Sequence, residues 1–170
     1  MNVIFLDFDG VLISFHDNTF EKIEKRIILL SEICKEYDCK VVIEAAVKNT
    51  IDEDSMVSSF EWVNNILDLL KKHNIDCIGI TPCMGKKRVF NTPIWKEDEI
   101  IMYLKKHPEI DHFCIIDDDD RIHISDLDKV RDYLVKPVFI SDNYEEEGLL
   151  SCHKEAVGKV LSKVNKFKQK

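Results

Sequence analysis

Short runs of apolar residues alternate along the chain with longer segments in which apolar residues recur every three or four positions. The short runs predict strands and the longer segments predict helices. The predicted strands span residues 3–6, 40–44, 75–81, 112–116 and 138–140, and the predicted helices span 18–36, 52–70, 96–106, 126–134 and 151–164. Because strands and helices alternate over short connections, we predict an α/β protein with a mainly parallel sheet and helices on both faces.

The ends of three predicted helices carry specific signals. Asn18 and Glu21 have the spacing of a capping box at the start of the first helix. Residues 52–55 offer N-caps for the second helix, whose buried face would begin at Met56. The last helix is expected to bury Val164 together with the apolar residues one and two turns before it.

The first apolar run ends in two acidic residues. Val3 to Leu6 lead directly into Asp7, Asp9 and Gly10. An unbroken apolar run of this kind is typical of a strand buried on both faces, and ligands of parallel sheets bind where such strands end. If strand geometry continues past Leu6, Asp7 and Asp9 point the same way and share one ligand. Two carboxylates at one point suit a hard cation such as Mg²⁺. The alternative interpretation is that these residues form only a solvated turn after the strand.

A second acidic cluster follows the predicted strand over residues 112–116. Asp117 and Asp118 come directly after that strand and open a run that continues to Asp120. If the two strands are neighbours, their carboxylates converge on one point and repel each other. A divalent metal ion is the natural complement to such a site, and it would in turn attract an anionic substrate.

Composition limits the classes of partner. The chain has 170 residues and a net charge of -8, which fits one domain and argues against unselective binding to nucleic acid or anionic membranes. We expect no transmembrane segment and no signal peptide, and six scattered cysteines fit reduced thiols in the cytoplasm. Delivery into a host cell as an effector is an alternative location. The lysine-rich end of the chain, residues 151–170, is interpreted as a solvated face or as a lead into a further domain.

Two motifs resemble those of the haloacid dehalogenase (HAD)-like phosphatase superfamily. The run Phe5-Leu6-Asp7-Phe8-Asp9-Gly10-Val11 is similar to the first motif of that superfamily, and Cys114-Ile115-Ile116-Asp117-Asp118 is similar to its fourth. The resemblance implies a Rossmann-like HAD fold. It also implies an Mg²⁺-dependent phosphatase that hydrolyses phosphomonoesters through an aspartyl-phosphate.

The resemblance also implies a role for each matching residue. Asp7 would attack phosphorus, and Asp9 would protonate the leaving group and then activate water. Asp118 would bind Mg²⁺ beside Asp7 and the backbone carbonyl of Asp9, with Asp117 in support. Lys96, which opens a predicted helix, is our choice for the cation of the third motif; a solvated lysine is the alternative.

The second motif departs from the superfamily pattern. The second predicted strand ends in Glu44 and Ala45, where the superfamily has a serine or threonine that binds phosphate. Lys48 and Thr50 lie close enough in sequence to compensate, and we expect Glu44, Ala45 and Lys48 to be the substrate-binding residues. A carboxylate near a phosphate is strongly repulsive, so Glu44 must turn away, pair with Lys48 or Lys96, or take up a proton.

The intervals between the motifs are too short for a large cap domain, so we predict an open site. Only one helix fits into the first interval, and one helix, one strand and a loop over residues 82–95 fit into the second. An open site favours a phosphoprotein, with phosphotyrosine preferred, and a nucleic-acid end phosphate is the second choice. The narrower resemblance is to compact members attached to RNA-repair proteins and to effector phosphotyrosine phosphatases of bacterial pathogens. The rival is a catalytically weakened module that binds Mg²⁺ and a phosphorylated ligand.

Overall fold

The computed structural model describes residues 1–83, 96–119 and 127–167 of the chain. The helices are α1 (Phe20–Tyr37), α2 (Glu61–Lys72), α3 (Lys96–Lys106) and α4 (His153–Leu161), with short 3₁₀ segments η1 (Ala46–Thr50), η3 (Asp128–Tyr133) and η4 (Tyr144–Glu146). The strands are β1 (Asn2–Leu6), β2 (Cys39–Ile43), β3 (Ile51–Asp52), β4 (Val57–Ser58), β5 (Cys77–Ile80), β6 (His112–Ile116) and β7 (Leu134–Val135). The predicted strand at 112–116 and the predicted helix at 96–106 are confirmed residue for residue.

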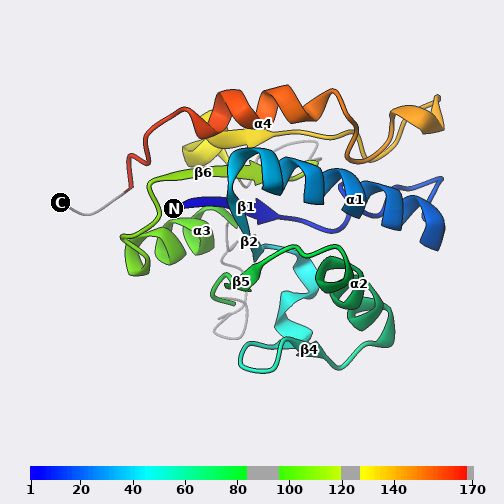
Figure 1. Ribbon diagram of the computed structural model, residues 1–170, viewed down its shortest axis with the longest axis horizontal. Helices are drawn as coiled ribbons and strands as arrows, with labels where there is room; N and C mark the ends of the chain where they lie inside the picture. Colours follow the sequence, from blue (N-terminus) through cyan, green and yellow to red (C-terminus); the bar gives the residue numbers. More distant parts are fainter. Residues whose placement is uncertain (84–95, 120–126, 168–170) are drawn as a thin grey trace, which may run out of the picture.

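The main sheet has five strands in the order β5-β2-β1-β6-β7 (Figure 1), and all of its pairs are parallel. β1 is the central strand, paired over its full length with β2 on one side and β6 on the other. The four apolar residues Val3 to Leu6 are completely buried, as the unbroken apolar run predicts. The ends of β1 and β6 are therefore neighbours at one edge of the sheet.

Helices cover both faces of the sheet because of the strand order. The chain moves outward from β1 through α1 to β2 and through α2 to β5, and then returns through α3 to β6 on the other side of β1. Right-handed crossovers place α1 and α2 on one face and α3 on the opposite face. Contacts between α1 and both α2 and α4 show that these three helices form one layer. The predicted α/β fold with a parallel sheet is confirmed.

The core on the α3 side is aromatic. Phe5 of β1 packs edge-on against Tyr103 of α3 and against Phe113 of β6, with ring centroids 5.8 and 5.9 Å apart. Phe113 in turn stacks on Tyr133 of η3. These contacts tie the central strand to α3 and η3, and both of these segments reach the edge of the sheet that carries the acidic residues.

The prediction of a helix from residue 52 is wrong in its first half. A short antiparallel hairpin, β3–β4, occupies residues 51–58, and α2 begins only at Glu61. Met56 has a φ of 52°, which a helix excludes, and the side chain of Asn64 bonds the backbone N–H and carbonyl of Ser58. These local bonds hold the hairpin, because side-chain amides and hydroxyls compete with helix formation.

Three smaller predictions are corrected as well. Thr19 rather than Asn18 caps α1, since its hydroxyl accepts the backbone N–H of Lys22. Val138 makes only isolated bridges to residues 147 and 148, so β7 at residues 134–135 takes the place of the predicted strand over 138–140. Val164 is 73% exposed because α4 ends at Leu161.

The state of the cysteines and the length and apolarity of the helices bear on two further sequence predictions. All six cysteine thiols are free. In the described ranges, no helix is long and apolar enough to cross a membrane. The assignment of residues 1–170 to one domain stays a prediction, and the predicted loop over residues 82–95 lies outside the described residues from residue 84 onward.

Candidate active site at the carboxyl edge of the sheet

The residues that follow three adjacent strands form the candidate site. Asp7 follows β1, Glu44 follows β2, and Asp117 and Asp118 follow β6. Backbone bonds continue the sheet past the strand ends, because the N–H of Asp7 donates to the carbonyl of Ile116 at 3.0 Å. The N–H of Glu44 likewise donates to Leu6 at 2.8 Å. Parallel pairing therefore brings these side chains to one edge, as expected for a ligand site in such a sheet.

Three carboxylates converge at this edge. Carboxylate oxygens of Asp7, Asp117 and Asp118 all lie within 4.8 Å of one another. Asp7 and Asp117 are almost fully buried, and one carboxylate oxygen of each accepts a hydrogen bond from a backbone N–H. Oδ1 of Asp7 accepts the N–H of Phe8 at 2.7 Å, and Oδ1 of Asp117 accepts the N–H of Asp119 at 2.8 Å. These bonds orient the remaining oxygen of each carboxylate.

Lys96 bridges those two remaining oxygens. It is the first residue of α3, and its Nζ donates to Oδ2 of Asp7 at 2.5 Å and to Oδ2 of Asp117 at 2.7 Å. Burial lowers the pKa of Lys96, but Asp7 and Asp117 together raise it well above its ordinary value, so the ammonium stays charged. Burial raises the pKa of Asp7 to about 7, and Lys96 opposes this shift.

The residues present fit a divalent cation. When all three carboxylates are ionised, they and the ammonium sum to -3 + 1 = -2, which a divalent ion would balance. Asp118 is the most exposed of the three, so the group opens toward solvent. Mg²⁺ is commonly held by one or two carboxylates and keeps water or phosphate oxygens as its other ligands. Asp7, Asp117 and Asp118 are the described residues that would hold it.

A tight turn follows Asp7 and separates it from the Asp9 carboxylate. β1 ends at Leu6, and the backbone N–H groups of Leu12 and Ile13 both donate to the carbonyl of Phe8 at 2.9 Å. The exposed Asp9 carboxylate is therefore outside the group that Asp7 forms with the two aspartates after β6. Asp9 lies on this turn, whose next residue, Gly10, packs against Asp118.

Gly10 is required within this turn for two reasons. Its φ of 74° lies in the left-handed region that favours glycine. A Cβ at this position would lie 2.4 Å from Cβ and Cγ of Asp118. The turn after β1 thus packs directly on the carboxylate after β6, which couples the first and fourth motifs in space.

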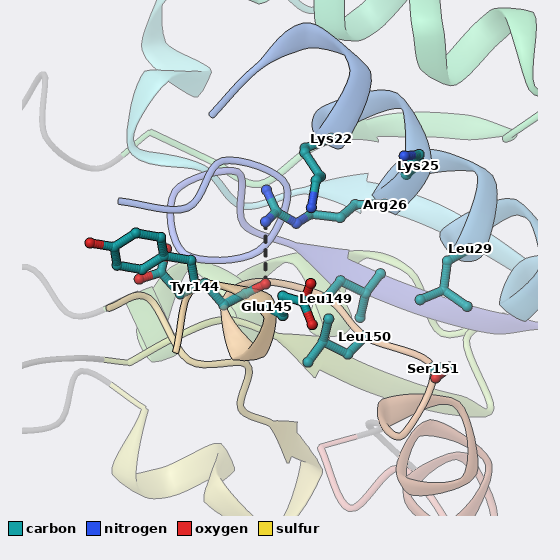
Figure 2. Close-up of a pocket in the computed structure, with 10 residues that line it drawn as sticks. Lys22, Lys25, Arg26, Leu29, Tyr144, Glu145, Leu149, Leu150 and Ser151 are labelled. Atoms are coloured by element: carbon teal, nitrogen blue, oxygen red, sulfur yellow. Dashed lines mark hydrogen bonds between the residues drawn. The ribbon is translucent and has the colours of Figure 1, made fainter. Parts of the chain in front are cut away.

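Arg26 anchors the chain that leaves this turn. It is buried on α1, and its Nη1 donates to the carbonyls of Leu12 at 2.9 Å and Asp17 at 3.1 Å. Its Nη2 donates to Oγ of Ser14 at 3.0 Å and to the carbonyl of Glu147 at 3.2 Å. Figure 2 shows this last bond reaching from α1 to the segment that carries Tyr144 and Leu149, beside a pocket of about 230 Å³.

The carboxylate of Glu147 completes the anchor from the opposite side. Oε2 accepts the backbone N–H of His16 at 3.0 Å, and Oε1 lies 2.6 Å from Nδ1 of His16 and accepts the N–H of Ser141 at 2.9 Å. Burial raises the pKa of Glu147, but these hydrogen bonds outweigh it and bring the pKa down to about 2. Sequence reasoning missed Arg26 and Glu147. The available signal was Arg26 itself, a cation on the apolar face of α1.

At the second motif, Glu44 is paired with Lys48. Nζ of Lys48 lies 2.7 Å from Oε1 of Glu44 and 2.5 Å from Oε2 of Glu99 on α3. The hydroxyl of Thr81, which follows β5, donates to the other oxygen of Glu44. Burial raises the pKa of Glu44 to about 8, and Lys48 opposes this shift. Glu44 thus combines two of the three arrangements expected for it: it lies against Lys48, and its raised pKa lets it hold a proton at neutral pH.

The other predicted residues of the second motif have structural partners. Ala45 is buried, and its carbonyl accepts the N–H of Lys48 at 3.0 Å. The Thr50 hydroxyl donates to the carbonyl of Val47 at 2.7 Å and contacts Oγ of Ser58 at 2.7 Å. The sequence predicted Thr81 only as the last residue of a strand and assigned it no role at the site. In the structure its hydroxyl bonds Glu44. A pocket of about 530 Å³, lined in part by Lys48 and Thr81, lies beside this cluster.

Comparison with known proteins identifies one family. A sequence model of the family described as the HAD domain in Swiss Army Knife RNA repair proteins matches residues 3–140, which is most of the chain. No curated protein and no solved structure matches the chain significantly. The matched range includes β1, β6 and α3, and so all of the carboxylates and the lysine of the candidate site.

Proposed function

Because this chain belongs to the HAD domains of Swiss Army Knife RNA repair proteins, a family of compact HAD-like hydrolases, we propose that it is an Mg²⁺-dependent phosphatase that acts through an aspartyl-phosphate on Asp7. The observation that carries the proposal is the convergence of Asp7, Asp117 and Asp118, with the ammonium of Lys96 bridging the first two. A buried acid with a perturbed pKa next to a fixed cation, as Asp7 is, is typical of catalytic sites.

In the first step, a carboxylate oxygen of Asp7 attacks the phosphorus atom of a phosphomonoester. A bond forms between Asp7 and phosphorus, and the ester P–O bond breaks. The leaving oxygen takes a proton from Asp9, whose exposed position on the turn suits a group that meets the leaving side of the substrate. The buried Oδ1 bond to Phe8 keeps Asp7 oriented for this attack.

In the second step, Asp9 takes a proton from water. The oxygen of that water attacks phosphorus, the bond between Asp7 and phosphorus breaks, and inorganic phosphate leaves. Both aspartates then return to their starting states. The turn anchored by Arg26 holds Asp9 beside the site through both steps.

Lys96 balances negative charge on the reacting phosphoryl group, because its ammonium lies between Asp7 and Asp117. When bound by Asp7, Asp117 and Asp118, Mg²⁺ supplies further charge neutralisation to the phosphoryl oxygens. The protonated state of Lys96 makes this contribution independent of pH over the ordinary working range.

Two classes of macromolecular substrate fit the proposal. The short intervals between the motifs favour a phosphoprotein, phosphotyrosine in particular, because intervals of this length leave no room for a large cap domain. The family description, which names RNA repair proteins, favours the end phosphate of a nucleic acid. The pocket beside Lys48 and Thr81, at the second motif, offers space for part of either leaving group.

Glu44 supports the rival proposal of a weakened enzyme that binds Mg²⁺ and a phosphorylated ligand without turnover. It stands where the superfamily has a phosphate-binding hydroxyl, and its charge repels phosphate unless it is neutralised. Two observations favour an active enzyme instead: Lys48 pairs with Glu44, and Thr81 places a hydroxyl on its other oxygen. The pairing reduces the repulsion that a bound phosphate would meet.

The test is hydrolysis of p-nitrophenyl phosphate with Mg²⁺ by the wild type and by Asp7→Asn. We expect Asp7→Asn to lose at least about a thousandfold in kcat, since the covalent step needs its carboxylate. Beryllofluoride is expected to inhibit the wild type. Asp68→Asn, an exposed aspartate on α2, is the matched control and keeps full activity. Full activity in Asp7→Asn would contradict the mechanism, and Mg²⁺ binding without hydrolysis would support the binding module. A panel of phosphotyrosine peptides and end-phosphorylated oligonucleotides then decides the substrate class.

A further inference from the structure

Two buried glutamates follow Lys96 in the first turn of α3. Glu97 is 5% exposed and Glu99 is 6% exposed, although α3 is a short surface helix and charged residues are rarely buried in such a place. Both carboxylates lie near the helix N-terminus, where the helix dipole favours negative charge. The dipole alone requires no burial, because a partly exposed acid such as Asp98 interacts with it equally well.

Glu99 ties α3 to the end of β2. Its Oε2 lies 2.5 Å from Nζ of Lys48, and the same Nζ lies 2.7 Å from Oε1 of Glu44. Lys48 is itself buried, in η1 directly after the second motif. A charged bridge therefore runs from the end of β2, through η1, to a helix position three residues after Lys96.

Glu97 ties the same helical turn to the opposite side of the site. Its Oε2 accepts the backbone N–H of Lys129 at 2.6 Å, and its Oε1 lies 3.0 Å from Nζ of Lys129. Lys129 belongs to η3, the segment that leads into β7 beside β6. The two glutamates thus reach from one helical turn to the two sides of the sheet edge between which Asp7 and Asp117 lie.

We propose that Glu97 and Glu99 are positioning residues that hold the start of α3 so that Lys96 meets Asp7 and Asp117. The inference rests on the proposed function. Buried ion pairs add little net stability compared with apolar packing, so fold stability alone gives a weak reason for the Glu44–Lys48–Glu99 cluster. The start of α3 must be placed accurately, because Nζ of Lys96 lies 2.5 and 2.7 Å from its two carboxylates. The long, flexible lysine side chain does not fix this position by itself.

The first test replaces Glu99 by Gln, which keeps the shape of the side chain and removes its charge. We expect kcat for p-nitrophenyl phosphate to fall about 10- to 100-fold, the upper figure being the loss that a displacement of about 1 Å causes. KM is expected to change by less than about twofold, because a displaced Lys96 still neutralises bound phosphate. Glu61→Gln is the matched control: it makes the same replacement in the first turn of another helix, α2, at an exposed residue, and it keeps wild-type kcat.

The second test repeats Glu99→Gln in a Lys96→Gln background. If Glu99 acts through Lys96, the double variant is no slower than Lys96→Gln alone. A further loss as large as in the wild-type background would overturn the proposal, and so would an unchanged kcat in Glu99→Gln with only a lower melting temperature. If Glu99→Gln does not fold, Glu97→Gln takes its place with the same expected kcat loss and the same control.

Hydrogen exchange separates this proposal from the proposed function. A wild type without hydrolysis would refute the phosphatase, but the glutamates would still hold the start of α3. In that case the amides of residues 100–103, whose helical acceptors lie in residues 96–99, exchange about tenfold faster in Glu99→Gln than in Glu61→Gln, because a local contact has been lost. Equal exchange in the two variants would refute the positioning role.

Discussion

At the scale of single residues, Glu44 shows how a side chain that is unfavourable by itself is accommodated. Lys48 and Thr81 bind its two oxygens, and neither residue lies on β2. Burial raises the pKa of Glu44 to about 8, with Lys48 opposing and Glu99 adding to the shift. The carboxyl group is thus buried in contact with a cation and a hydroxyl, and its proton is held more tightly in the folded protein than in the unfolded chain.

This shift predicts the pH dependence of stability at Glu44. Between about pH 4.5 and about pH 8 the folded state holds a proton that the unfolded state releases, so the free energy of unfolding of the wild type falls as pH rises. Gln at position 44 does not titrate. In denaturant unfolding, the free energy of unfolding of Glu44→Gln minus that of the wild type is therefore expected to rise by at least about 1 kcal/mol from about pH 5 to about pH 9. Glu53→Gln, exposed on the hairpin, is the control for losing one carboxylate. A difference that is constant with pH would show that Glu44 is ionised throughout.

At the scale of elements, the segment between β1 and α1 is held from two sides. Arg26 binds its carbonyls from α1, and the Glu147 carboxylate binds the N–H of His16 from the segment before α4. Gly148 has a φ of 74°, and a Cβ there would lie 2.5 Å from Nε of Arg26, so the second segment approaches as closely as the backbone allows. The turn that carries Asp9 depends on this anchor for its place beside the site.

The anchor predicts a linked loss of stability and activity in Glu147→Gln. At neutral pH we expect a loss of about 1–3 kcal/mol in the free energy of unfolding, because a charged acceptor of three hydrogen bonds is removed. The pKa of Glu147 is about 2, so its contribution is present above the unfolded pKa of about 4.5 and is lost as pH falls toward 2. The difference between variant and wild type should therefore shrink in acid.

Activity gives a second reading of the same variant. A looser turn places Asp9 less accurately, so kcat is expected to fall about tenfold or more. Glu146→Gln, the exposed neighbour, is the matched control and should affect neither property strongly. If Glu147→Gln kept its stability at neutral pH, the segment before α4 would have no part in holding the turn.

At the scale of the whole molecule, the carboxyl edge of the sheet gathers charges from elements far apart in sequence. With all three carboxylates ionised, Asp7, Asp117 and Asp118 together with Lys96 carry the net charge of -2 that a divalent ion would balance. A ligand that binds only the folded state stabilises the entire fold. Metal binding can therefore be measured from the stability of the protein as well as from its activity.

Mg²⁺ at a hundredfold excess over its Kd adds about 2.7 kcal/mol to the free energy of unfolding of the wild type. We therefore expect the melting temperature to rise by about 5–10 °C. Asp118→Asn should lose most of this shift and need far more Mg²⁺ for hydrolysis, since one of three converging carboxylates is neutralised. The Glu53→Gln control should keep the full shift. An Asp118→Asn protein that titrates with Mg²⁺ as the wild type does would remove Asp118 from the metal site.

The sequence by itself determined the elements whose information is local. The run Val3–Leu6 predicts a fully buried strand because its apolar pattern has no exposed face, and residues 96–106 and 112–116 carry complete helix and strand patterns. The positions of Asp7 and Asp117 at strand ends follow directly from those patterns. The resemblance of both motifs to the HAD superfamily is confirmed by the family that matches residues 3–140.

Only the tertiary structure decided which distant groups meet. Residues 51–58 form a hairpin because Asn64 bonds Ser58, a contact that outweighs the helical pattern from residue 52. Lys48 reaches both Glu44 and Glu99, 51 residues away from it. Arg26 joins Leu12 to Glu147, 121 residues beyond it. Such contacts satisfy buried charges and polar groups, and their partners depend on how strands and helices are placed in space, which local periodicity does not encode.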